Sequence, residues 1–97
     1  MNVTDLIDKF VVFYVVGGDV KYPTMMEVKQ VEDIAGRVFL SGSQPQNIMG
    51  LYNWLGGVPT HIAWDQVTQF HVFENYKSYK QIVSEDQGGR FFDRFKN

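Results

Sequence analysis

Short apolar runs separated by glycine and proline make up most of the chain, a pattern typical of sheet proteins. Residues 10–16 are all β-branched or aromatic and run into Gly17-Gly18, which predicts a strand that enters a tight turn. A short helical turn capped by Thr4 or Asp5 would precede this strand. The alternative is a longer N-terminal helix, because helical spacing is also met by Leu6, Ile7, Phe10, Val11 and Tyr14.

Both faces of this predicted first strand are apolar. Successive side chains of a strand point to opposite sides, and both the even-numbered and the odd-numbered members of residues 10–16 are aliphatic or aromatic. Such a strand needs cover on both sides. We expect a bent or barrel-like sheet to enclose one face, and helices together with a subunit contact to cover the other.

Four more strands are expected, at residues 25–34, 37–41, 60–63 and 68–73. The apolar positions of residues 25–34 fall out of strict alternation, so we expect a β-bulge near Lys29-Gln30 or a break in the strand. Ala35-Gly36 is the expected hairpin tip. In the last strand we expect Phe70 and Val72 on the core face. The opposite face then carries Gln69, His71 and Phe73.

Two short helices are expected, at residues 45–55 and 75–84. The first begins after Ser43 as a cap and ends at Gly56-Gly57, and its apolar stripe consists of Ile48, Leu51, Tyr52 and Leu55. Gly50 inside this helix costs about 1 kcal/mol relative to alanine. Asn75 caps the second helix, whose inner stripe consists of Tyr76, Tyr79, Ile82 and Val83.

Together these elements predict an α+β fold, with a strongly bent antiparallel sheet of about five strands and two short helices. The sheet is either open or closed like a small barrel of the SH3 or Sm type, a comparison that rests on strand count and length alone and implies no function. The 97 residues form a single domain, 1–97, because chains divide into domains only well beyond this length.

Composition and charge exclude several classes of protein. Hydrophobic residues at 44% indicate a globular core, which excludes a disordered chain. No apolar run approaches the roughly 20 residues that cross a bilayer. Residues 1–5 lack the features of a signal peptide, so we expect a cytoplasmic protein without a membrane partner. The chain has no cysteine and therefore neither disulfides nor a thiolate nucleophile.

Chemically reactive groups are sparse. A metal or acid-base site could be built only from His61, Asp65, His71 and Glu74. His71 and Glu74 differ by three positions, which sends their side chains to opposite faces of a strand. Nucleophile-elbow and phosphate-loop motifs are also missing from the sequence. We therefore predict a protein that is not an enzyme and has no catalytic residue, metal site or cofactor.

An aromatic ligand pocket is the second functional hypothesis. The residues that would form its wall and polar groups are Tyr52, Trp54, His61, Trp64 and Asp65. The alternative interpretation is that Trp64 closes the end of the sheet core while Asp65 caps the turn.

Nucleic-acid binding is the third hypothesis and concerns the C-terminal tail. The chain has a net charge of -2, which argues against a polyanion as the main partner. Residues 77–97 are nevertheless net basic and include Phe91, Phe92 and Phe95, which suits stacking on a single strand. Alternatively these rings dock on the domain itself or on a neighbouring subunit.

The leading hypothesis is a non-catalytic protein-binding or self-assembling module. Apolar and aromatic residues exceed what one small core readily hides, and an exposed first strand would be a pairing hazard. We expect a homodimer, the commonest closed assembly, although a different protein partner would satisfy the same argument. The candidate interface residues are Phe13, Phe91, Phe92 and Phe95.

Overall fold

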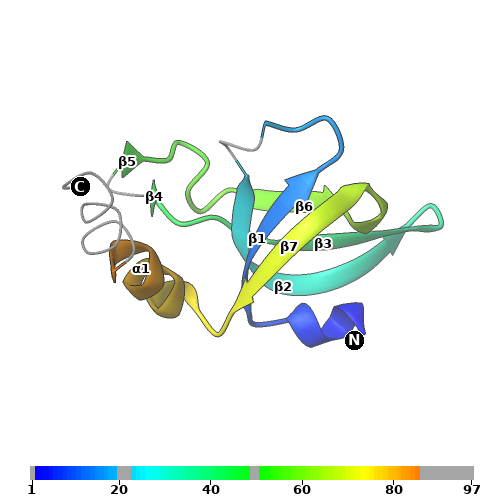
Figure 1. The fold of residues 1–97 in the computed structure, drawn as a ribbon. Coiled ribbons are helices and arrows are strands. Elements are labelled where there is room, and N and C mark those ends of the chain that lie inside the picture. The colour runs from blue at the N-terminus through cyan, green and yellow to red at the C-terminus, as the bar shows by residue number, and fades with distance from the viewer. Residues whose placement is uncertain (1, 20–22, 49–50, 86–97) are drawn as a thin grey trace.

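The computed structural model of the chain describes residues 2–19, 23–48 and 51–85. Its body is a five-stranded antiparallel sheet in the order β6-β3-β2-β1-β7 (Figure 1). The strands are β1 (Phe10–Val15), β2 (Thr24–Ile34), β3 (Arg37–Ser43), β6 (Pro59–Ala63) and β7 (Val67–Phe73). The predicted α+β class and the antiparallel sheet of five strands are confirmed, and the longer N-terminal helix is excluded.

Short elements complete the fold. The 3-10 turn η1 (Val3–Leu6) precedes β1, and a second one, η2 (Trp64–Gln66), joins β6 to β7. The α-helix α1 (Tyr76–Glu85) follows β7 and is capped by Asn75, whose side-chain oxygen accepts a 2.8 Å hydrogen bond from the Ser78 amide, as predicted. No helix in the described part of the chain is long and apolar enough to cross a membrane.

Strand β2 is shared by the two halves of the sheet. Its first residues pair with β1 and its later residues pair with β3, and the register shifts between Val28 and Gln30. This confirms the predicted bulge at Lys29, and a bulge bends a strand and increases its twist. Gly42 on β3 lies so close to the bulge that a side chain there would collide with the Glu27 carbonyl oxygen.

The main core fills the inner face of the bent sheet. Val11 and Phe13 of β1 are fully buried there. They belong to a cluster completed by Leu6, Met26, Val28, Leu40 and Ile62. At the margin of this cluster Trp64 of η2 packs against Phe70 of β7, with ring centroids 5.2 Å apart. Trp64 therefore closes the end of the core, which was one of the two expectations for this residue.

A second apolar cluster covers the opposite face of β1. Phe10 packs between Tyr76 and Tyr79 of α1, with ring centroids at 5.2 and 5.0 Å. Val12 and Met25 are buried in the same cluster. Helix α1 thus covers the part of this face formed by Phe10 and Val12, whereas Val16, just after β1, is 64% exposed. The other predicted stripe residues of α1 pack in this cluster, but the side chain of Ile82 is exposed.

The predicted helix at residues 45–55 is wrong. The described residues form two short paired strands instead, β4 (Asn47–Ile48) and β5 (Leu51–Tyr52). The side-chain amide of Asn53 donates to the Gln44 side chain at 3.1 Å and to the Pro45 carbonyl at 2.9 Å. These side-chain bonds hold the segment in a non-helical form, and glycine at position 50 lowers helix propensity further.

Two finer expectations also differ from the structure. The cap of η1 is Asn2, whose side chain accepts from the Thr4 amide at 3.2 Å, while Asp5 accepts from the Asn2 amide at 3.1 Å. Thr4 and Asp5 are therefore not the capping residue, although Asp5 completes a capping box. Strands β6 and β7 lie at the two ends of the sheet order and do not pair, so closure into a barrel is not confirmed.

Candidate functional site

The two edges of the sheet are the places where backbone groups remain available to another chain. Among the described residues, β7 pairs only with β1 and β6 pairs only with β3, so each of these strands has one unpaired side. An edge strand presents a row of N–H and C=O groups that can template pairing with a further strand. The two edges differ in how well the sequence protects them.

Strand β7 lacks two of the usual protections of an edge, charge and proline. It is seven residues long and its sequence VTQFHVF contains no charged residue, proline or glycine. Natural edge strands are commonly protected by charged residues, by proline, by short length or by a β-bulge. Thr68 forms a bulge against Tyr14-Val15, so the regular part of the edge is residues 69–73. This stretch is an open template of uniform geometry.

Contacts on both faces hold β7 in place. On the outer face the His71 ring meets Tyr14 edge-on, with centroids 6.0 Å apart, and its Nε2 lies 3.0 Å from Gln69 Nε2. Phe73 packs against Tyr79 of α1 at 5.3 Å, while Phe70 packs inward on Trp64. These positions agree with the predicted faces of the strand. The free edge is therefore pre-organised.

Val72 is the apolar side chain that β7 leaves exposed. It shares the inward face with Phe70, as predicted, but 44% of its surface remains accessible. The expectation that Val72 lines the main core is therefore wrong. A branched apolar side chain beside a free strand edge offers a contact to any strand that is added there.

Strand β6 is the better protected edge. It is five residues long and begins at Pro59, which has no amide hydrogen to donate. The Thr60 hydroxyl next to it accepts a 3.2 Å hydrogen bond from the Gln44 side chain, which ties the start of β6 to the segment that carries β4 and β5. Proline and short length are two of the devices that discourage strand addition.

The aromatic residues of the predicted ligand pocket do not lie together. Tyr52 and Trp54 are 79% and 76% exposed, in and just after β5. Trp64 lies in η2, which joins β6 to β7 at the opposite end of the sheet from β5 (Figure 1). These rings therefore cannot form one wall. His61 is exposed on β6, opposite Ser41 of β3.

Asp65 has a structural partner. Its carboxylate accepts two hydrogen bonds from Arg37, at 2.9 Å from Nε and 2.8 Å from Nη2, a bidentate geometry. The Arg37 hydrogen bonds and charge hold the pKa of Asp65 below its usual range. Asp65 thereby links η2 to the start of β3. This replaces the expected role of Asp65 as a turn cap.

The remaining candidates for metal or acid-base chemistry are dispersed. Glu74 accepts a 2.7 Å hydrogen bond from Lys9, and His71 lies among Gln69 and Tyr14. No cluster of three metal-binding side chains occurs within the described ranges. On the outer face of the sheet, Ser41 donates its hydroxyl hydrogen to Glu32 at 3.1 Å rather than to His61 across from it.

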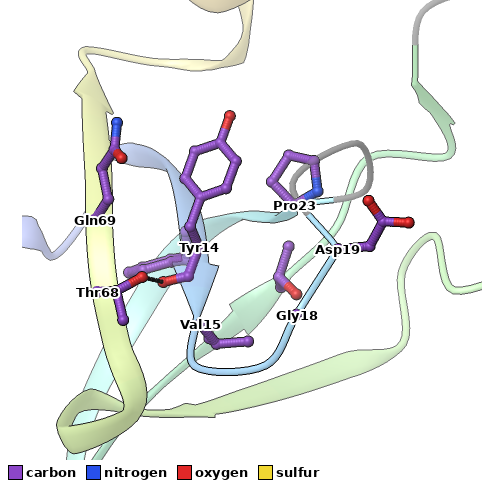
Figure 2. A pocket seen from close by; sticks show the side chains of 9 residues that line it. Tyr14, Val15, Gly18, Asp19, Pro23, Thr68 and Gln69 are labelled. Atoms are coloured by element: carbon purple, nitrogen blue, oxygen red, sulfur yellow. Dashed lines mark hydrogen bonds between the residues drawn. The ribbon is translucent and has the colours of Figure 1, made fainter.

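A shallow hollow of about 350 Å³ adjoins the start of β7 (Figure 2). Tyr14 and Gln69 project side by side along one margin, and Asp19 and Pro23 form the other. At its base the Thr68 hydroxyl donates to the Tyr14 carbonyl at 3.2 Å, which secures the bulge. The hollow lies over β1 and the segment that follows it, on the side of β7 that already pairs with β1, and not along the free edge of β7.

The proposed interface residues divide into two groups. Phe13 lies fully buried in the main core, so its ring is used by its own chain. Phe91, Phe92 and Phe95 lie outside the described residues. The β7 edge was missed as an interface, because the sequence reveals a strand but not its position at the end of the sheet.

Comparison with known proteins adds no assignment. No family model, curated protein or solved structure matches this chain.

Proposed function

We propose that this chain is a non-catalytic protein-binding module that pairs with another polypeptide strand along β7. The observation that carries the proposal is the uncharged, proline-free edge of β7, which is fixed on both faces by aromatic contacts. Recognition by strand addition takes its affinity from backbone hydrogen bonds and its selectivity from alternate side chains.

The strand order supports a scaffold suited to this task. A long second strand shared by both halves, and two edge strands joined by a three-residue turn, favour a small barrel of the SH3 or Sm type with an open seam between β6 and β7. An open seam leaves both edge strands in place for pairing. The resemblance concerns architecture and carries no function by itself.

Affinity for a single added strand is expected to be modest. Each backbone hydrogen bond contributes about 0.5 to 1.5 kcal/mol net, and each cross-strand side-chain pair about 0.2 to 1 kcal/mol. The regular part of β7 offers room for only a few of each. The module therefore fits a partner that is presented repeatedly or at high local concentration.

A neutral strand-forming peptide tests the proposal without knowledge of the natural partner. We expect a soluble peptide of alternating valine and threonine to shift the backbone amide resonances of residues 67–73 and to leave those of 60–63 unchanged. Val72→Lys should abolish the shifts, because a charge on an edge strand opposes addition. Shifts that are equal at both edges, or that are absent when the chain is monomeric, would contradict the proposal.

The nucleic-acid hypothesis involves the tail at residues 90–96, which lies outside the described residues, and stays a prediction. Its test is the dependence of affinity on salt, since phosphate contacts weaken steeply as the salt concentration rises. Cytoplasmic location likewise stays a prediction.

A further inference from the structure

We infer that the strand added to β7 is β7 of a second copy, in antiparallel pairing about a two-fold axis at His71. This inference rests on the proposed function and names its partner. The reason for a dimer is now the edge of β7 and not the second face of β1, where α1 covers Phe10 and Val12.

The bulge fixes the register of such a pair. Residues 69–73 are the regular stretch of the edge, and His71 is its centre. A two-fold axis through His71 is the placement that pairs all of this stretch with its own copy. Phe70 then lies opposite Val72 of the second copy, and Gln69 lies opposite Phe73 of the second copy.

This register also satisfies the exposed side chain on the inner face. Val72 is 44% accessible, while the Phe70 beside it is anchored on Trp64. Side chains that are directly opposite in an antiparallel pair lie on the same face and contact each other. Each Val72 would therefore be covered by a Phe70 ring of the other copy, an aromatic and β-branched pair of the kind that stabilises sheets.

Charge does not oppose a second copy in this register. Two copies with net charge -2 would repel if acidic groups met at the contact, but β7 itself carries no charge. Glu74 is the first acidic residue after the strand and is paired with Lys9. With the axis at His71, Glu74 falls opposite Thr68 of the second copy, so the two Glu74 carboxylates lie at opposite ends of the ribbon.

The other edge cannot close the assembly in the same way. Pairing of β7 with β6 of another copy would join two different surfaces, and such contacts form rings or open chains. Pro59 and the short length of β6 oppose that arrangement. The two-fold β7 pair closes on itself and leaves no second β7 edge free.

Because the chain has no cysteine, each single cysteine variant carries one thiol, and disulfide formation reports the distance between copies. In His71→Cys the two Cα atoms would lie about 4.5 to 5.5 Å apart, within disulfide range. In Gln69→Cys they would lie roughly 13 Å apart, given about 3.3 Å per strand residue. His61→Cys on β6 is the matched control at the other edge.

We expect His71→Cys to form a covalent dimer at least about tenfold faster than Gln69→Cys or His61→Cys in mildly oxidising buffer. The wild-type chain should sediment as a concentration-dependent dimer and Val72→Lys as a monomer. A monomeric wild type, or equal cross-linking at Gln69→Cys or His61→Cys, overturns the inference. If the valine-threonine peptide still shifts β7 in that case, strand addition stands and only the second copy is wrong. If it does not, both proposals fail.

Discussion

The two edge strands of the sheet, β6 and β7, occupy equivalent positions but differ in sequence. β6 and β7 follow one another in the chain, each pairs with one neighbour, and each carries one of the two histidines. β6 is short and begins with proline, whereas β7 is longer and has neither proline nor charge. Sequence, rather than position in the fold, therefore decides which edge can accept a further strand.

The same comparison explains why an unprotected edge can be kept without loss of order. Phe70 anchors β7 to η2 and Phe73 anchors it to α1, on opposite faces of the strand. β6 instead depends on β3, which itself must pass closely by the bulge of β2 at Gly42.

The largest expected effect is the loss of unfolding free energy when Phe70, which anchors β7 to η2, is truncated. Phe70→Ala should lower the free energy of unfolding by about 3 kcal/mol, the low end for phenylalanine because the ring is only half-buried. His71→Ala, at an exposed position of the same strand, should cost within about 0.5 kcal/mol. Urea denaturation measures both, and equal losses would mean that the faces of β7 are assigned the wrong way round.

A second variant acts on the support of β6. Gly42→Ala should cost about 1 to 3 kcal/mol, because the new methyl group collides with the Glu27 carbonyl and forces β3 away from β2. Amide exchange should then accelerate in β6 more than in β7. Ser43→Ala, the next residue of β3, serves as the control. Uniform acceleration of both edges would argue against separate supports.

Self-association should respond to β7 alone. Val72→Lys should weaken dimerisation at least about tenfold, or about 1.4 kcal/mol, with little change in the thermal midpoint. Ile34→Lys is the matched control, since Ile34 is a similarly exposed aliphatic residue, at the end of β2. Sedimentation velocity compares the two variants. An equal loss in Ile34→Lys would indicate a general effect of charge rather than a β7 contact.

The smallest expected effect concerns η2, which joins the two edges. Arg37→Ala should raise the pKa of Asp65 toward its usual value, because the guanidinium hydrogen bonds are lost. When the pKa of a carboxyl group is lower in the folded state than in the unfolded state, the ionised group stabilises the fold at pH values above its unfolded pKa. This stabilisation is lost as the pH falls through the folded pKa. The two proteins should therefore differ slightly near neutral pH and converge in acid. Carbon-13 titration of the Asp65 carboxyl gives the pKa directly.

Local patterns were sufficient for the five strands of the main sheet. Alternation predicted residues 68–73, and the phase shift of the apolar positions predicted the bulge at Lys29. The helix predicted at residues 45–55 was wrong because the apolar spacing of this segment also suits a helix. The Asn53 hydrogen bonds that hold the segment in another form depend on how the loop folds back onto Gln44 and Pro45. The separation of Trp54 from Trp64, and the edge position of β7, depend on strand order, which no local pattern contains.

The most direct test of the central claim is hydrogen exchange of the wild-type chain at low and high protein concentration. Amides of residues 69–73 on the free side of β7 should exchange more slowly in the concentrated sample, because strand pairing protects them. The amides of β6 at residues 60–63 should be unaffected. Protection that appears in β6, or exchange that is independent of concentration at both edges, would contradict the assignment of β7 as the docking edge for a second copy.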